Sequence, residues 1–515
     1  MISSVRIAES GSAGADEIEI FARLQAGFPE MYRRVFADPK LPRTVVVIPS
    51  LSLEQGELAK IAGVLHYEER LLCLLMLLRM PRTRIVYVTS TAIDLAVVDY
   101  YLHLLPGVPS AHARGRLTML HVDDRSLRPL TAKILSRPDV IERIRSEVDR
   151  NPDATHMTCF SSTDLERTLA VRLGIPMYAP APEFAVLGTK TAGRRLLEEV
   201  GMTVPAGVEG IRDRSDLVSA LVAIARRSPG AERVVVKLDQ GFSGEGNALV
   251  RVSGLEEVAD PQAELHRRLE HELRCVATDE TPEAFLGKLE AMGGIAEVLI
   301  EGTGARSPSV QVRIDPLGGV QLVSTHDQVL GGRDGQVFLG CTFPARPEYR
   351  LDLHRTGVVL GQALRERGVI GRFAVDFVSV PTDDGWRHHA IEINLRKGGT
   401  TLPYLMLEFL TSGSYDADSG RFLTPTGDER SYYATDNLVL PALIGRTPEE
   451  LIDWAVYEEL HFDASSQQGV VFHLMGAVTD HGKVGVVSIA PDQASAESQY
   501  ASTVLALTGT PPAPA

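Results

Sequence analysis

The chain has 515 residues and a formal net charge of −15, with 44% hydrophobic and 23% charged residues. This composition is that of an ordinary globular protein with room for several domains. The net negative charge argues against a protein whose main function is to bind nucleic acid. The longest apolar run, residues 71–80, is about half the ~20 residues of a membrane span, so we expect no membrane partner.

The cysteines are scattered and form no C-x-x-C pair: Cys73, Cys159, Cys275 and Cys341. This pattern is typical of reduced thiols rather than of a disulfide framework or a zinc site. The first residues lead into a polar, acidic stretch and show no apolar segment with a cleavage site. We therefore expect a cytoplasmic protein.

Residues 1–40 form a mixed polar segment with room for one helix. From there to residue 182 the chain alternates between apolar strands and helices, which predicts a Rossmann-like parallel sheet covered on both faces. No G-x-G-x-x-G follows the first strand, so a dinucleotide fingerprint is missing. We expect this region to act as a scaffold that contributes substrate contacts at its strand ends. The predicted strands are 43–50, 84–89, 117–122 and 155–160, and the predicted helices are 66–80, 140–148 and 163–173.

The next region, 183–300, contains a strand that ends in a glycine-rich loop. Lys237 lies in that strand, and Gly241, Gly244 and Gly246 follow it with Ser243 between them. Such a loop can approach a ligand closely and point its amides at phosphate oxygens. The alternative is a hairpin turn with a surface lysine. Around this strand we expect helices at 189–201 and 215–226, a short strand near 202–205 and a charged helical insertion at 254–293.

From residue 295 onward the pattern is mainly antiparallel. A hairpin of two apolar strands, 371–380 and 387–400, is its most informative part. Residues 412–430 are linker-like in composition. The remaining predicted strands are 295–302, 309–314, 320–324, 469–476 and 483–489, and the remaining helices are 351–367, 403–410, 447–460 and 493–507.

The hairpin carries a set of hard oxygen ligands. Glu392 and Asn394 project from one side of the second strand, and Asp376 lies near the middle of the first. Two carboxylates and an amide oxygen form a site that Mg²⁺ prefers, with nucleotide phosphates and water completing it. Alone, the same pattern equally fits the solvated face of an ordinary hairpin.

These parts in this order resemble the ATP-grasp superfamily over residues 187–410. The run from Glu392 to Pro403, E-I-N-L-R-K-G-G-T-T-L-P, and the small C-terminal region look most like the pheganomycin-type peptide ligases. The resemblance implies a mixed α/β and α+β chain. Its expected domains are a Rossmann-like pre-ATP-grasp domain (1–182), a nucleotide lobe (183–300), a metal-binding lobe (301–411) and a C-terminal α+β domain with a disordered tail (412–515).

The resemblance also implies a role for each motif. Lys190 and Lys237 would contact the phosphates of ATP, and the glycine loop would close over them. The hinge Glu297–Ile300 would read the adenine edge, with Leu299 and Ile300 near the ring and Glu301 at the ribose. Asp376, Glu392 and Asn394 would hold Mg²⁺.

Two arginines are candidate catalytic residues, Arg313 and Arg396, because a guanidinium suits a transferring phosphoryl group or a substrate carboxylate. A solvated surface charge is the alternative for each. Arg396 is favoured because it lies two places beyond Asn394 on the same face. Either His326 or Gln328 is expected to line the substrate pocket.

The activity that the resemblance implies is ATP- and Mg²⁺-dependent joining of a small-molecule or peptide carboxylate to an amine. It would proceed through an acyl phosphate and release ADP and phosphate, as in natural product biosynthesis. The alternatives are a carboxylate–thiol ligase, a kinase or a non-catalytic ATP-binding scaffold. The substrates are not encoded in a readable motif, and the oligomeric state stays open, a homodimer included.

Overall fold

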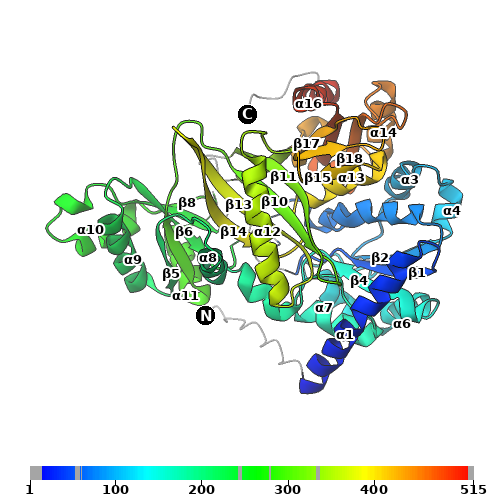
Figure 1. Ribbon diagram of the computed structural model, residues 1–515, viewed down its shortest axis with the longest axis horizontal. Helices are drawn as coiled ribbons and strands as arrows, with labels where there is room; N and C mark the ends of the chain where they lie inside the picture. The colour runs from blue at the N-terminus through cyan, green and yellow to red at the C-terminus, as the bar shows by residue number, and fades with distance from the viewer. Residues whose placement is uncertain are drawn as a thin grey trace.

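The computed structural model describes residues 14–52, 58, 61–241, 246–277, 280–331 and 337–508. Within these residues the strands form sheets of four, eight, two and five strands. Figure 1 shows the parallel sheet at the right, the largest sheet in the centre and a smaller lobe at the left. The mixture of one parallel sheet with antiparallel ones confirms the predicted α/β and α+β fold class.

The parallel sheet has the order β3-β2-β1-β4. Along β1 the side chains alternate between two cores: Val45 and Val47 pack in one cluster, and Val46 and Ile48 in the other. Burial on both faces is why this strand is apolar without a break, and it confirms the predicted Rossmann-like sheet. The strands are β1 (Arg43–Ile48), β2 (Thr83–Thr89), β3 (Leu117–His121) and β4 (Thr155–Cys159).

Helices cover both faces of this sheet. The start of α7 is fixed by a capping box between Thr163 and Glu166, and its end by Gly174, which has a φ of 69°. The helices are α1 (Ala15–Ala37), α3 (Leu95–His103), α4 (Ser110–Arg114), α5 (Leu130–Leu135), α6 (Pro138–Val148), α7 (Asp164–Leu173) and the short 3₁₀ turn η2 (Pro152–Ala154).

The leucine-rich helix predicted at 66–80 is a 3₁₀ helix, η1 (Val64–Arg79). In this geometry side chains repeat every three residues. Leu72, Leu75 and Leu78 have that spacing and are completely buried. The apolar run was predicted correctly as a buried helix, but the sequence did not predict that the helix would be of the 3₁₀ type.

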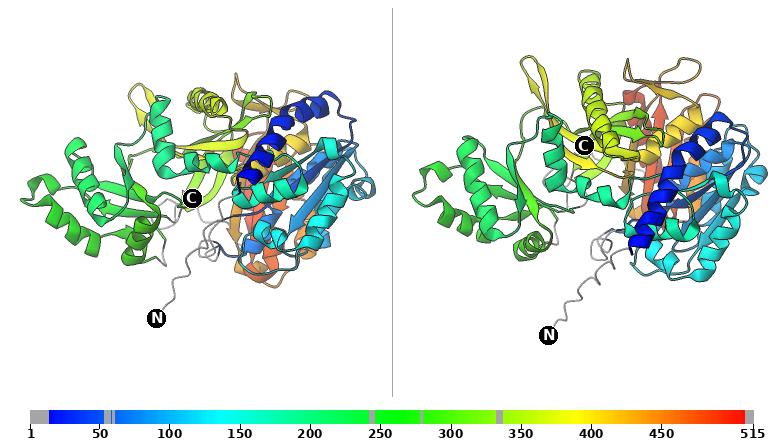
Figure 2. Two further views of the ribbon diagram at one scale, coloured as in Figure 1. Left: turned by 90° about the horizontal axis from the view of Figure 1, so that it is seen from below. Right: turned by 60° about the horizontal axis from the view of Figure 1, so that its bottom comes forward.

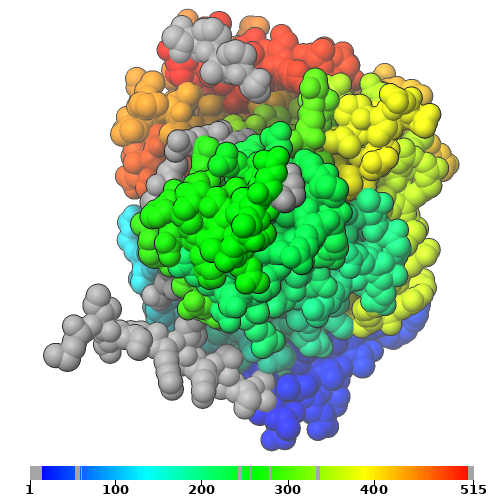
Figure 3. Space-filling model, turned by 90° about the vertical axis from the view of Figure 1, so that its left-hand side faces the viewer, coloured from blue at the N-terminus to red at the C-terminus, as the bar shows by residue number. Residues whose placement is uncertain are grey.

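The lobe at the left is an antiparallel sheet of order β5-β9-β6-β7-β8 with its own core. Figure 3 shows this lobe, in green, projecting in front of the rest of the molecule, and both views of Figure 2 show it to one side. The strand predicted near 202–205 was wrong, since Pro205 cannot donate to a ladder, and β5 begins at Gly207. The elements are η3 (Pro182–Gly188), α8 (Lys190–Glu199), β5 (Gly207–Ile211), α9 (Arg214–Arg227), β6 (Arg233–Leu238), β7 (Asn247–Arg251), η4 (Leu255–Glu257), α10 (Pro261–His271), β8 (Arg274–Cys275), α11 (Pro282–Met292) and β9 (Gly294–Val298).

The largest sheet has the order β14-β13-β10-β11-β12-β17-β19-β18. Helix α12 packs closely on it through two glycines: a Cβ on Gly361 would lie 2.6 Å from Cγ1 of Val320, and one on Gly357 would lie 3.1 Å from Cγ2 of Val310. The elements are β10 (Pro308–Ile314), β11 (Val320–Gly331), β12 (Val337–Phe343), α12 (Arg350–Glu366), β13 (Gly371–Thr382), β14 (Gly385–Asn394), α13 (Thr401–Thr411), β17 (Ser431–Val439), β18 (Gly469–His473) and β19 (Lys483–Ala490).

The C-terminal strands therefore extend the sheet that carries the predicted metal ligands. Residues 412–430, predicted as linker-like, instead form a hairpin whose Phe422 is buried and packs edge-on against Phe343 and Tyr404. Strand β17, which the sequence did not predict, joins β12 to β19. The other elements are β15 (Ser414–Asp416), β16 (Arg421–Leu423), η5 (Pro441–Leu443), α14 (Pro448–Tyr457), η6 (Met475–Ala477), α15 (Val478–His481) and α16 (Gln493–Thr508).

Cys73, Cys159, Cys275 and Cys341 are all free thiols. Among the described residues, every helix is too short or too polar to span a bilayer.

Replacing the buried His326 with Phe is expected to change how stability depends on pH. Burial lowers the pKa of His326 to about 3, and its Nε2 lies 2.6 Å from the Tyr432 hydroxyl. Below pH 6.5 the unfolded chain binds a proton at His326 that the folded chain excludes. His326 therefore lowers the free energy of unfolding of the wild type by about 1.4 kcal/mol for each unit by which the pH drops below 6.5. At neutral pH the variant should be about 1–2 kcal/mol less stable, because Tyr432 loses its partner.

Urea unfolding at pH 7.5, 6.0 and 5.0 measures this difference. The deficit of His326→Phe should shrink below pH 6.5 and reverse near pH 5. A deficit that stays constant over this range would show that His326 does not titrate as its burial requires.

Candidate active site

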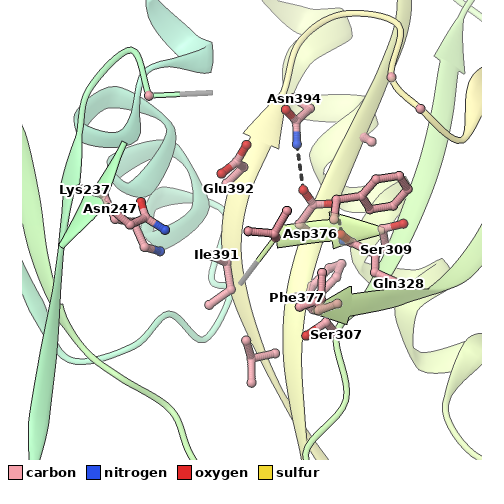
Figure 4. Close-up of a pocket in the computed structure, with 18 of the residues that line it drawn as sticks. Lys237, Asn247, Ser307, Ser309, Gln328, Asp376, Phe377, Ile391, Glu392 and Asn394 are labelled. Carbon is pink, nitrogen blue, oxygen red and sulfur yellow. Dashed lines mark hydrogen bonds between the residues drawn. The ribbon is translucent and has the colours of Figure 1, made fainter. Parts of the chain in front are cut away.

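The predicted metal ligands meet on neighbouring strands. Asp376 on β13 is the direct partner of Glu392 on β14 and of Ser309 on β10. The Asn394 amide donates to Oδ2 of Asp376 at 2.7 Å, and the Gln328 amide donates to Oδ1 at 3.1 Å. Figure 4 shows Glu392 facing Lys237 and Asn247 across the cavity. The hairpin therefore brings the three predicted ligands together, and Gln328 joins them.

The two carboxyl groups have opposite pKa shifts. Burial, followed by the charge of Glu392, raises the pKa of Asp376 to about 7. Burial also acts to raise the pKa of Glu392, but Lys190, with Nζ 2.5 Å from Oε2, outweighs it together with the charges of Lys237 and Arg396 and lowers that pKa. Lys190 neutralises one carboxylate, and the other lacks a full counterion and takes up a proton near neutral pH.

Lys237 belongs to a buried charge network on the opposite sheet. Its Nζ lies 2.7 Å from Oε2 of Glu297, and Arg194 Nη1 lies 2.6 Å from Oε1 of the same carboxylate. Glu297 is 1% exposed. Glu297 therefore fixes the position of the lysine and remains paired through Arg194 if Lys237 engages a ligand.

The ends of the glycine loop are held close together. A Cβ on Gly246 would lie 2.6 Å from Cα of Gly241, so a side chain at 246 would force the loop ends apart. Ser243 and Gly244 lie outside the described residues. Just before the loop, Asp239 accepts the amide hydrogen of Thr191 at 2.7 Å, which ties the start of α8, and with it Lys190, to the end of β6.

The predicted hinge lines the same cavity, but two of its amides already have backbone partners. The Val298 amide donates to the Ala206 carbonyl at 2.8 Å, and the Leu299 amide donates to the Arg233 carbonyl at 3.0 Å. The carboxylate of Glu301 pairs with the Arg233 side chain. Adenine recognition by these two N–H groups is therefore not available, although the side chains border the cavity.

The structure separates the two predicted arginines. Arg396 lines the cavity, and its Nη2 donates to Oδ1 of Asn394 at 3.1 Å. Arg313 does not line it: its Nε donates to Gln321 at 3.1 Å. It lies four residues along β10 from Ser309, or roughly 13 Å, beyond the reach of the carboxylates. We therefore leave Arg313 out of the site.

The cavity has a volume of about 650 Å³ and lies between the five-stranded and the eight-stranded antiparallel sheets. Gln328 lines it, whereas His326 does not. Among the described residues, no group of three or more His, Cys, Asp or Glu could hold a metal. The lining also includes residues that the sequence did not indicate, among them Tyr67, Arg70, Ser309, Asp436 and Lys483.

Lys397 anchors the turn after β14 to the parallel sheet. Its Nζ donates to Oγ1 of Thr158 at 2.8 Å and to the Cys159 carbonyl at 2.6 Å. Burial lowers the pKa of Lys397 to about 8. Because Arg396 precedes this anchor directly, we treat Lys397 as a positioning residue.

Lys397→Met is expected to lower kcat about tenfold and to leave the KM for ATP within about twofold, because a displaced Arg396 affects the reacting groups more than nucleotide binding. Steady-state ADP release measures both constants. A proportionate loss of folded protein, with normal kcat per folded molecule, would contradict the positioning role.

Comparison with known proteins identifies the family. Two family models match the chain. The one described as "IQCH-like, ATP-grasp" matches residues 182–281 and 262–418, and the one described as "PGM1 C-terminal domain" matches residues 450–503. The L-propargylglycine–L-glutamate ligase of Streptantibioticus cattleyicolor is 32% identical over 480 residues, which cover 90% of this chain and 94% of that protein. The chain belongs to the ATP-grasp family. This membership confirms the predicted recognition and the predicted class of enzyme, an ATP-dependent ligase.

Solved structures share the fold of this ATP-grasp chain. An ADP complex of N5-carboxyaminoimidazole ribonucleotide synthetase has a TM-score of 0.50 at 13% identity and covers 90% of this chain and 97% of its own. The biotin carboxylase domain of Hydrogenobacter thermophilus 2-oxoglutarate carboxylase, crystallised with MgADP, ADP and bicarbonate, has a TM-score of 0.52 at 14% identity and covers 90% and 89%. Both likenesses concern the fold alone.

Proposed function

We propose that this ATP-grasp ligase joins the carboxylate of one α-amino acid to the amine of another, with conversion of ATP to ADP and phosphate. The observation that carries the proposal is a single cavity with paired carboxylates, Asp376 and Glu392, on one wall and Lys237 on the other. The Streptantibioticus relative, named for ligation of two amino acids, supports the substrate class. The domain division at residues 182, 300 and 411 is part of the same proposal.

Lys190 and Lys237 are proposed to bind the phosphates of ATP, with the loop that starts at Gly241 above them and the hinge around the base. Asp376, Glu392 and Asn394 fit a magnesium ion, because they are hard oxygen donors and because Asp376 has a pKa of about 7 that a nearby cation would lower. Bound Mg²⁺ would neutralise phosphate charge. The number of ions is left open.

The reaction has two steps. A carboxylate oxygen of the first substrate attacks the γ-phosphorus, and the bond from that phosphorus to the bridging oxygen of ADP breaks, which gives an acyl phosphate. The amine of the second substrate attacks the carbonyl carbon, loses a proton, and phosphate leaves as the amide forms. Neither step requires a protein nucleophile, so the side chains act by positioning, charge and exclusion of water.

The cations of the cavity have distinct proposed roles in these steps. Arg396, fixed by Asn394, faces the transferring phosphoryl group or the reacting carboxylate. Lys190, on the N-terminal turn of α8, exchanges its contact with Glu392 for a phosphate when nucleotide enters. Water must be kept out because it would hydrolyse the acyl phosphate.

Product analysis tests the proposal. The full chain is incubated with ATP, Mg²⁺ and pairs of amino acids that include L-glutamate, and nucleotides, phosphate and dipeptides are quantified. Equal amounts of ADP, phosphate and dipeptide are expected, with hydroxylamine trapping the acyl phosphate as a hydroxamate. AMP and pyrophosphate would contradict the route. A stable phosphorylated product without amine would indicate a kinase, and product with thiols alone a carboxylate–thiol ligase.

A further inference from the structure

One end of the cavity is lined by charged residues that the proposed chemistry does not use. Arg70 comes from η1, Asp436 from β17 and Lys483 from the start of β19. The Arg70 Nη2 lies 2.5 Å from Oδ2 of Asp436, and both side chains are 11% exposed. The Lys483 Nζ donates to the Tyr67 hydroxyl at 2.7 Å. We name these four residues the charged end of the cavity.

The Arg70 guanidinium is held in one orientation. Its Cζ lies 3.9 Å above the centroid of the Tyr67 ring and 5.5 Å from that of Phe160, while Asp436 holds Nη2. Its Nε is buried and has no hydrogen-bond partner among the described residues. A buried donor of this kind is costly unless a ligand satisfies it.

The local charge is positive. Burial acts to raise the pKa of Asp436, but Arg70, His473 and Lys483 together outweigh it and hold that pKa below its usual range, so the carboxylate stays ionised. Arg70 and Lys483 therefore exceed Asp436 by one charge at this end of the cavity, in a chain whose formal net charge is −15. An anionic ligand group would offset this excess.

We propose that Arg70 and Lys483 bind the non-reacting carboxylate of the α-amino acid that supplies the amine, with Asp436 and Tyr67 as positioning residues. This inference rests on the proposed ligase function and adds the recognition of the second substrate. Arg70 gives the planar donor set and Lys483 the point charge that carboxylate recognition uses.

The location separates this carboxylate from the reacting one. The charged end is built by the pre-ATP-grasp region and the C-terminal strands, whereas the candidate phosphate and metal residues lie on α8, β6, β13 and β14. Gly398 and Gly399 line the main cavity and also a small neighbouring cavity that Arg70 and Asp436 share. An amino acid held there by its carboxylate can direct its amine toward Arg396 and the acyl phosphate.

The test uses binding, which does not require turnover, together with ADP release. Calorimetry in the presence of ADP and Mg²⁺ compares a panel of L-α-amino acids with their α-carboxamides, for wild type, Lys483→Met and Arg70→Met. The wild type should prefer the acid at least about tenfold, and both variants should lose most of that preference. Lys483→Arg should retain part of it. Lys40→Met is the matched control, because Lys40 is exposed and does not line the cavity.

Each outcome decides a point. Equal binding of acid and amide by the wild type, or a preference that survives both substitutions, would overturn the inference. Weaker nucleotide binding with unchanged acid preference would assign the charged end to phosphate and also overturn it. Acid preference that depends on Lys483 without ADP release from any amino acid pair would support the inference and reject the ligase proposal.

Discussion

Glu392→Gln is expected to reduce the rate of ADP release at saturating ATP by at least about a hundredfold, the effect of losing one preorganised electrostatic contact at the reacting centre. Glutamine keeps the shape of the side chain but removes the charge that faces Lys190 at 2.5 Å and that we propose binds Mg²⁺. Carboxylate ligands bind Mg²⁺ far better than amides do. The variant should therefore also need more Mg²⁺ to reach half of its own maximal rate.

Folding of Glu392→Gln should be preserved, since the amide oxygen can still accept a hydrogen bond from Lys190. Circular dichroism and thermal melting check this. Glu348→Gln is the matched control, because Glu348 is exposed, and it should retain wild-type turnover. Normal turnover in Glu392→Gln would remove this carboxylate from the site.

Lys237→Met is expected to weaken ATP binding at least about tenfold, the loss of one charge-assisted contact to phosphate. The fold should tolerate the change, because Glu297 keeps its contact with Arg194 at 2.6 Å and no buried carboxylate is left unpaired. Calorimetry with a non-hydrolysable ATP analogue measures the affinity.

Lys40→Met again serves as the control and should bind nucleotide like the wild type. Comparison of the analogue with adenosine separates the two possible causes of weaker binding. If Lys237→Met weakens adenosine as much as the triphosphate, the lysine supports the base-binding wall rather than the phosphates.

The sequence was sufficient for features set by local alternation. Within a hairpin the period of two decides which side chains share a face, so Asp376, Glu392 and Asn394 were predicted together and lie together. Lys237 was found for a similar reason, since its strand runs into a glycine-rich loop. These residues need only one turn and one strand pair to be placed.

Features that depend on packing between segments distant in the sequence could not be predicted from the sequence. Arg70 and Asp436 are 366 residues apart, and only the joining of β17 to the central sheet brings them to one cavity. Arg313 was misjudged because a strand pattern gives the face of a side chain but not how far along the sheet the cavity reaches. The order of β12, β17 and β19 depends on long-range pairing that composition does not encode.

The continuity of the central sheet has a consequence for fragments of this chain. β12 is bordered by β17, which follows it by almost a hundred residues, so a fragment ending at residue 411 would leave its backbone N–H and C=O groups uncovered beside an apolar surface. An exposed edge strand with unpaired backbone groups promotes self-association. The C-terminal segment therefore protects the catalytic half from aggregation as well as closing its cavity.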